Sequence, residues 1–220
     1  MRDLFGESVK FDAYGLFAYV KKGNETSKLD KSTQLFLYAL KDNRTFTSQG
    51  EKLDPANFFA EFAATWKEVA QIGSGCDLVP IPQSEVTVAG AYWPGQKFAT
   101  ALQKQKVGAA VNPCVQRITP VAKSSRAKSK GERTTVEEHM KSMKVVSVPK
   151  KPVLLIDDTL TLGSTGMAVH QLLRAAGHTK PIALLAACYT RREAEEAKPH
   201  VKFIVDWFPG NSYADKVRVR

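Results

Sequence analysis

The fold is decided by the stretch Val153-Leu154-Leu155-Ile156-Asp157-Asp158-Thr159-Leu160-Thr161-Leu162-Gly163-Ser164-Thr165-Gly166. Its first four residues are uniformly apolar, which is typical of a short strand buried on both faces of a sheet. Two carboxylates follow, and then a turn rich in Thr, Ser and Gly. The apolar spacing that begins at Met167 predicts a helix, and Gly177 is placed to end it. The unit therefore predicts an α/β fold, in which a mainly parallel twisted sheet is flanked by helices and binds its ligand at the carboxyl ends of the strands.

The loop of this unit has the chemistry to bind a ribose phosphate. Its backbone N–H groups, together with the N-terminus of the following helix, present partial positive charge to a phosphate. Hydroxyl donors come from Thr161, Ser164 and Thr165, and the glycines allow a close approach of the backbone. Ionised Asp157 and Asp158 can only accept hydrogen bonds, which suits two neighbouring sugar hydroxyls.

The same run resembles the 5-phosphoribosyl-1-pyrophosphate (PRPP) signature of the type I phosphoribosyltransferases, in which an apolar strand and two acidic residues precede Thr-Thr-Gly-x-Thr or a close relative. Thr159 stands where the family usually has an apolar residue, and Thr161 stands where the 6-oxopurine members have an Asp that assists catalysis. The resemblance implies a phosphoribosyltransferase-like, Rossmann-like fold. It also implies PRPP binding by Asp157, Asp158, Thr161, Leu162, Gly163, Ser164 and Thr165.

A second segment, Val79-Pro80-Ile81-Pro82, is similar to the Val-Pro-x-Pro of ComF-type members of the family. It predicts a short strand entering a rigid loop, with a helix from about Pro94 to Lys106. The Arg residues that the family places in this loop are missing, and Ser84 stands nearby as a candidate PRPP ligand. A plain strand-loop-helix connection is the alternative. The cysteine-rich zinc module of ComF-type chains is missing too, since the three cysteines form no paired spacing.

Residues 117–151 are strongly basic, with ten Lys or Arg residues against three Glu. The part from Lys123 to Arg133 has almost no apolar content and cannot pack into a core. Phosphoribosyltransferases have a mobile basic loop at this point in the chain, so the resemblance implies that Lys128, Lys130 and Arg133 neutralise the leaving pyrophosphate, with Lys130 and Arg133 as catalytic residues. A solvated charged loop and a nucleic-acid contact through residues 123–151 remain as alternatives.

The length of 220 residues and the 43% apolar content predict one domain, residues 1–220. Within it we expect a core over 73–220 and a small N-terminal cap over 1–72, formed by a hairpin of Phe11–Lys21 with Gln34–Lys41 and by a helix opening at Asp54-Pro55. Val201–Trp207 is expected to be the last strand. At its end, Asp206 and Trp207 would contact the acceptor, or Trp207 would simply pack at the sheet edge.

The sequence thus predicts Mg²⁺-dependent transfer of a phosphoribosyl group from PRPP to an unidentified acceptor, with release of pyrophosphate, as in nucleotide metabolism. The metal would bind mainly through substrate oxygens, near Asp157 and Asp158. A non-catalytic PRPP sensor and a nucleic-acid-binding protein, which the net charge of +10 would suit, stay open. The apolar runs are too short to span a bilayer and no signal-peptide core is visible, so we expect a cytoplasmic protein without membrane contact. The pattern is compatible with a homodimer.

Overall fold

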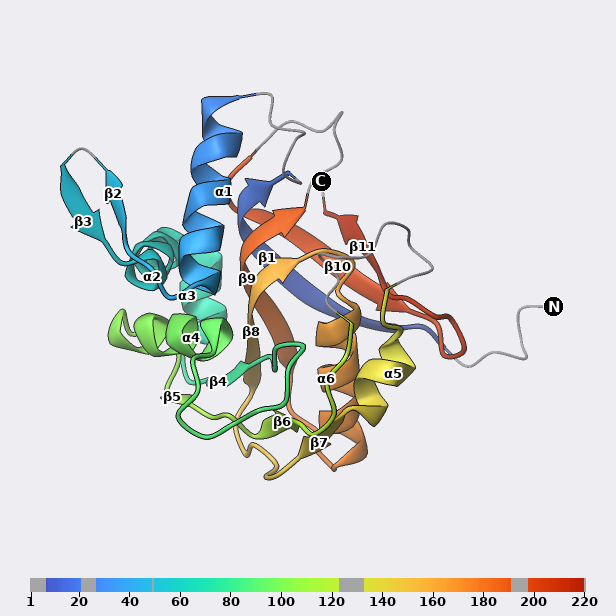
Figure 1. Ribbon diagram of the computed structural model, residues 1–220. Helices are drawn as coiled ribbons and strands as arrows, with labels where there is room; N and C mark the ends of the chain where they lie inside the picture. The colour runs from blue at the N-terminus through green and yellow to red at the C-terminus, as the bar shows by residue number, and fades with distance from the viewer. Residues whose placement is uncertain (1–6, 21–26, 49, 123–132, 191–197, 220) are drawn as a thin grey trace.

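The computed structural model describes residues 7–20, 27–48, 50–122, 133–190 and 198–219. Its main sheet is built from β1 (Val9–Tyr19), β4 (Asp77–Pro80), β5 (Ala110–Val111), β8 (Val153–Leu160), β9 (Ile182–Thr190), β10 (Val201–Trp207) and β11 (Asp215–Arg218). The seven strands lie in the order β11-β10-β1-β9-β8-β4-β5 (Figure 1). The five from β1 to β5 in this order run parallel, and β10 and β11 are antiparallel to their neighbours. The predicted α/β architecture with a mainly parallel sheet is confirmed.

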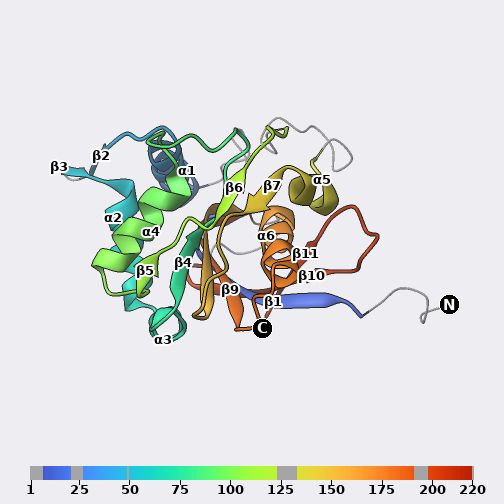
Figure 2. The ribbon, with the colours of Figure 1, turned by 90° about the horizontal axis from the view of Figure 1, so that it is seen from below.

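Helices cover both faces of this sheet (Figures 1 and 2). One face carries α1 (Lys28–Lys41), α2 (Pro55–Thr65), α3 (Lys67–Gly73) and α4 (Pro94–Lys104). The other carries α5 (Val136–Lys141), α6 (Ser164–Ala175) and a two-stranded sheet of β6 (Val115–Arg117) and β7 (Met143–Val145). A further hairpin, β2 (Phe46–Ser48) with β3 (Glu51–Leu53), lies beside α2.

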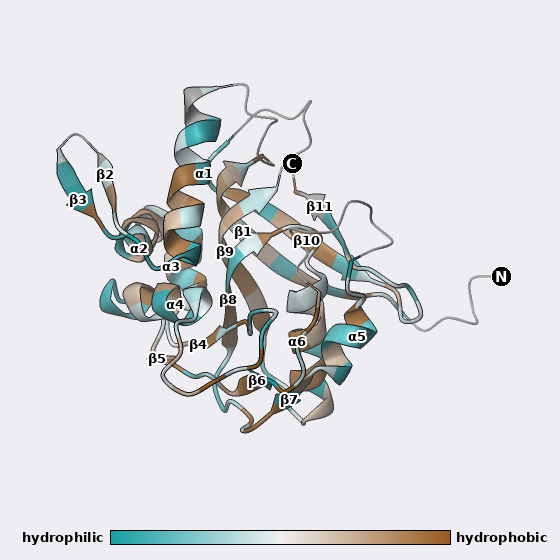
Figure 3. Ribbon diagram, viewed as in Figure 1, coloured by the Kyte–Doolittle hydropathy of each residue, from teal (hydrophilic) through white to brown (hydrophobic). Residues whose placement is uncertain are grey.

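Strand β8 separates two hydrophobic cores because its successive side chains alternate between the faces of the sheet. Leu154 and Ile156 pack with the helices of the α1–α4 face, while Leu155 packs with α6 residues such as Met167. Figure 3 shows the central strands as mostly hydrophobic and the outer turns of α4 and α5 as hydrophilic. A strand buried on both faces is what the uniform apolar run predicted.

The predicted N-terminal hairpin is wrong, because residues 34–41 belong to helix α1 rather than to a strand. A capping box starts this helix: the Asp30 amide donates to Ser27 Oγ at 3.1 Å, and the Ser27 amide donates to Asp30 Oδ2 at 3.1 Å. The predicted N-terminal cap is wrong as well. Strand β1 is inserted between β9 and β10, with Ala13 opposite both Leu184 and Phe203, so the N-terminal segment is part of the main sheet.

Several other sequence predictions are confirmed with shifted bounds. Asp54 caps α2 by accepting from the Ala56 amide at 2.9 Å, and Pro55 is the first residue of that helix. Helix α6 is followed by Gly177, which has a φ of 96°. The signature strand runs on to Leu160, so Asp157 and Asp158 lie inside it and not after it.

Candidate functional site: the crevice between β4 and β8

The order of the strands reverses between β4 and β8. Helix α4 leads from β4 outward to β5, whereas α6 leads from β8 in the other direction to β9. These two helices pack on opposite faces of the sheet, so their N-termini flank the carboxyl ends of β4 and β8 from both sides. In open α/β sheets, a reversal of this kind creates the crevice where ligands bind.

Two glycines bring the helix N-termini close to the strand ends. A Cβ on Gly95, in the first turn of α4, would lie only 3.1 Å from the Ile156 carbonyl oxygen. A Cβ on Gly166, in the first turn of α6, would lie 2.6 Å from a methyl group of Leu184. The Ile81 amide donates to the Ile156 carbonyl at 2.9 Å, where β4 stops pairing with β8. Among the described strands only β9 pairs with residues 157–160, so the β4 side of β8 is open there.

The two acidic side chains lie at this open part of β8. By the alternation of the strand, Asp158 is on the α1 side and Asp157 is on the α6 side. Lys41, the last residue of α1, approaches Asp158 with 3.6 Å between Nζ and Oδ2. Asp157 Oδ1 accepts a hydrogen bond from the Asp158 amide at 2.8 Å. The site therefore contains two adjacent carboxylates and one ammonium group.

The two carboxylates repel each other. Burial, followed by repulsion from the Asp158 charge, raises the pKa of Asp157 to about 7. In return, the charges of Asp158 and Asp157 raise the pKa of Lys41 above its ordinary value. Two full negative charges side by side are thus disfavoured near neutral pH. Hydroxyl donors or a cation placed between the carboxylates would stabilise the doubly ionised pair.

The turn after β8 leaves the N-terminus of α6 without a side-chain cap among the described residues. Gly163 has a φ of 88°, which any residue with a Cβ adopts only with strain, and a Cβ there would lie 2.7 Å from Val205 Cγ1. Ser164 Oγ accepts from the Ala214 amide at 3.2 Å, and Thr165 Oγ1 lies 3.2 Å from His139 Nε2. Thr161 and Leu162 are half-buried in the same turn. The structure therefore places the predicted loop and the acidic pair next to each other at the carboxyl end of β8.

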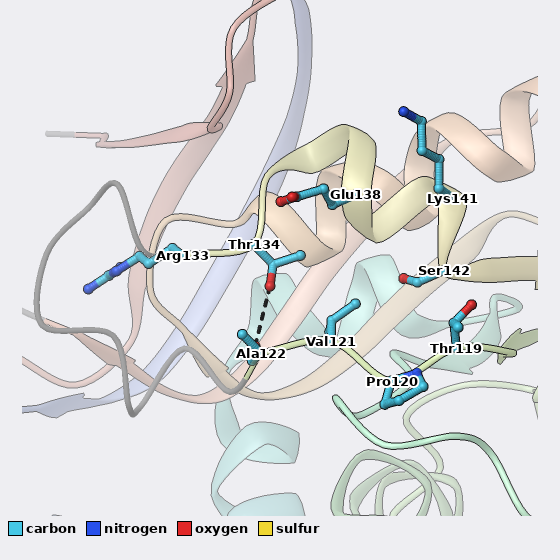
Figure 4. A pocket seen from close by; sticks show the side chains of 9 residues that line it. All are labelled: Thr119, Pro120, Val121, Ala122, Arg133, Thr134, Glu138, Lys141 and Ser142. Atoms are coloured by element: carbon cyan, nitrogen blue, oxygen red, sulfur yellow. Dashed lines mark hydrogen bonds between the residues drawn. The ribbon is translucent and has the colours of Figure 1, made fainter.

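Among the remaining predicted basic and loop residues, the structure describes Ser84 and Arg133, and both lie outside the unit formed by β8, its loop and α6. Ser84 is half-buried in the loop after β4, and its carbonyl accepts from the Val121 amide at 2.9 Å. Lys128 and Lys130 lie outside the described residues. Arg133 lines a separate cavity of about 460 Å³, and the acidic pair is not part of its lining. The lining residues are Thr119, Pro120, Val121, Ala122, Arg133, Thr134, Glu138, Lys141 and Ser142. In Figure 4 the Arg133 side chain points away from the Ser142 end of this cavity.

The expected acceptor residues are engaged in packing and pairing. Trp207 is 7% exposed, belongs to the α6-side core and donates from Nε1 to the Asn211 carbonyl at 2.8 Å. Asp206 Oδ2 lies 3.4 Å from Lys10 Nζ. The indole of Trp207 is thus used for packing, the alternative that the sequence left open.

Sequence reasoning missed four polar residues that the fold brings to the crevice or its walls. Lys41 was missed because α1 was predicted as a strand, although the Ser27–Asp30 capping pattern was a usable signal. The Tyr92 hydroxyl contacts the Leu40 carbonyl. Burial is the main cause that raises the pKa of Tyr92 to about 12, and the charges of Asp54 and then Asp158 add to it. Arg117 and His139 lie buried between the loop after β4 and α6. No sequence pattern pointed to them.

Comparison with known proteins adds no identification. No family model matches the chain, and no curated protein matches it. Within the described ranges no group of three or more His, Cys, Asp or Glu side chains is placed to hold a metal ion. No helix in the same ranges is long and apolar enough to cross a membrane.

Proposed function

We propose that this protein binds PRPP in the β4/β8 crevice and transfers its phosphoribosyl group to an acceptor, releasing pyrophosphate. The observation that carries the proposal is the convergence of the acidic pair and the uncapped α6 N-terminus at the reversal of the strand order. A ribose 5-phosphate has hydroxyl groups that can donate to the two carboxylates and a phosphate that can bind at the helix N-terminus. The family resemblance of residues 157–165 supports the same ligand.

In this proposal each part of the crevice has one task. The N–H groups of the first turn of α6, with the hydroxyls of Thr161, Ser164 and Thr165, hold the 5-phosphate. Asp157 and Asp158 accept hydrogen bonds from the ribose hydroxyls. Lys41 compensates part of their charge. Acidic residues at the end of a buried strand are rigidly placed, so the sugar is oriented before any acceptor attacks it.

The donor set also fits the Mg²⁺ ion that the reaction would use. Asp157 and Asp158 offer carboxylate oxygens, the ligand type that Mg²⁺ prefers, and two carboxylates leave most of its positions to water and substrate oxygens. Burial and mutual repulsion already disfavour double ionisation, so a divalent cation nearby would relieve that cost. When bound, the ion would neutralise charge on the pyrophosphate group.

The test is to incubate the protein with PRPP, Mg²⁺ and a panel of nucleobases and other nitrogen nucleophiles, and to measure pyrophosphate release. The double substitution Asp157→Asn with Asp158→Asn should abolish PRPP binding in calorimetry, since each lost charge-assisted hydrogen bond costs about 1.5–3 kcal/mol. Glu61→Gln, on the exposed side of α2, is the matched control and should bind as wild type does. Unchanged PRPP affinity in the double variant would contradict the assignment of Asp157 and Asp158 as PRPP ligands. PRPP binding without turnover on any acceptor would favour the sensor.

A further inference from the structure

Arg117 is a buried guanidinium group with no carboxylate beside it in the described parts of the chain. Only 1% of the residue is exposed. Its Nε donates to the Gln83 carbonyl and its Nη1 to Ser142 Oγ. Its Nη2 lies 3.5 Å from the Pro82 carbonyl oxygen and 3.4 Å from His139 Nδ1. Burial lowers the pKa of Arg117 to about 10, so it remains charged at neutral pH.

The charge of Arg117 determines the direction of the hydrogen bonds around it. A guanidinium group has donors and no acceptor, so His139 Nδ1 must accept and cannot carry a proton. Ser142 agrees with this direction: its Oγ accepts from Arg117 and donates to the His139 carbonyl at 2.7 Å. His139 is 4% exposed, and burial together with Arg117 lowers its pKa to about 3. The ring is therefore neutral, with its single proton on Nε2.

This tautomer acts on the candidate phosphate loop. His139 Nε2 lies 3.2 Å from Thr165 Oγ1, so its N–H donates to that oxygen. The hydroxyl hydrogen of Thr165 is then left for another acceptor. Thr165 is the second residue of α6, in the turn whose backbone N–H groups lack a side-chain cap among the described residues.

We propose that Arg117 and His139 are positioning residues that keep the Thr165 hydroxyl as a hydrogen-bond donor for a phosphate at the α6 N-terminus. The identity of the ligand rests on the proposed function, whereas the orientation of the network does not. Because Arg117 also holds the Pro82 and Gln83 carbonyls, the same network links the loop after β4 to the turn after β8. These are the two sides of the crevice.

The orientation can be tested without any ligand. The ¹⁵N chemical shifts of the His139 ring, assigned by their loss in His139→Gln, should show an unprotonated Nδ1 and a protonated Nε2 in the folded protein at neutral pH. A ring with its proton on Nδ1, or a doubly protonated ring, overturns the proposal.

Ligand affinity tests the consequence, with ribose 5-phosphate as the probe in calorimetry and ribose as the control ligand. Thr165→Val should weaken ribose 5-phosphate binding by roughly tenfold, the loss expected for one hydrogen bond to a charged group. His139→Met cannot donate to Thr165 and offers Arg117 only the weak acceptor of a thioether, so it should weaken ribose 5-phosphate binding several-fold. His139→Gln keeps one acceptor and one donor and should retain most of the affinity.

The decisive comparison is non-additive. Adding His139→Met to Thr165→Val should cause no further loss of ribose 5-phosphate affinity, because His139 would act only through the Thr165 hydroxyl, which Thr165→Val has already removed. A full additional loss, or wild-type affinity in His139→Met alone, overturns the positioning role. Failure of the proposed function looks different: the wild-type protein itself would bind ribose 5-phosphate no better than ribose.

Discussion

At the scale of single residues, Asp157 has a charge state that changes near neutral pH. Its pKa is raised from an ordinary value of 3.8 to about 7 by burial and by Asp158. Between these two values the folded protein binds more protons than the unfolded chain, so Asp157 makes the free energy of unfolding fall as the pH rises through this window. Asp157→Asn removes this dependence and should be more stable than wild type at pH 8, on the order of 4 kcal/mol, with little difference below pH 4.

Chemical denaturation of both proteins between pH 4 and pH 8 measures this difference directly. The buried histidines, whose pKa values are lowered to about 3 for His139 and about 4 for His170, affect both proteins equally and cancel in the comparison. Glu61→Gln should show no such trend. A stability difference that is the same at every pH would rule out Asp157 as its origin.

Arg133 offers a second residue-scale prediction, because its proposed role is confined to the leaving pyrophosphate. Arg133→Ala should lower the turnover number much more than the PRPP affinity, since charge builds on the leaving group only in the transition state. Lys141→Ala, on the same cavity wall, serves as the comparison. Equal pyrophosphate release by wild type and Arg133→Ala would remove Arg133 from the proposed mechanism.

At the scale of elements, the turn from β8 into α6 depends on Gly163. An Ala there meets two costs: the strain of a φ of 88°, and a Cβ only 2.7 Å from Val205 Cγ1. Gly177→Ala is the matched control, since Gly177 has a φ of 96° but no atom within 4 Å of the added Cβ. It should cost only the backbone strain, about 1–2 kcal/mol, and Gly163→Ala should cost more.

Val205→Ala separates the two costs of Gly163→Ala. The double variant Gly163→Ala with Val205→Ala should lose less stability than the sum of the losses of the two single variants. The reason is that Val205→Ala removes the clash with the added Cβ but not the backbone strain. Urea denaturation of the two single variants and the double variant gives the comparison. Equal losses in Gly163→Ala and Gly177→Ala would show that Val205 does not constrain the turn.

Local sequence signals predicted the elements of the site well where they were used. The uniform apolar run located β8, Asp54-Pro55 located the start of α2, and Gly177 the end of α6. Helix α1 was mistaken for a strand because its many aromatic and aliphatic residues were given more weight than its capping box. Thr135 with Glu138 makes a similar capping box at the start of α5. His139 and Arg117 could not be located from sequence, because their roles depend on contacts between segments far apart in the chain.

At the scale of the whole molecule, the position of β1 could not be predicted. Nothing local to residues 9–19 says that this strand pairs with β9 on one side and β10 on the other. The family resemblance covers only the later part of the chain. The first 72 residues were therefore predicted to form a separate cap and not part of the main sheet. Nonlocal pairing of strands is the part of a topology that sequence periodicity does not determine.

Deleting residues 1–20 tests the position of β1. The shortened chain should lose its cooperative thermal transition in circular dichroism, because the deletion exposes both pairing edges and removes buried Ala13, Tyr14 and Leu16 from the two cores. Lys10→Ala, which removes only a surface ion pair worth about 0–1 kcal/mol, should melt nearly as wild type does. A normal melting curve for the shortened chain would mean that β1 is dispensable, as a cap would be.

The insertion of β1 between β9 and β10 also sets the order of events during synthesis. Leu184, the β9 partner of Ala13, is added to the chain about 170 residues after Ala13, on the order of 10–35 s later at usual elongation rates. For that whole interval the nascent strand has neither neighbour, and it carries unpaired backbone groups and apolar side chains. Once β9 and β10 have been synthesised, they must not pair with each other, because β1 has to insert between them. The sheet can therefore be completed only after β9 and β10 have been synthesised, and until then β1 is exposed to chaperones and to aggregation in the cell.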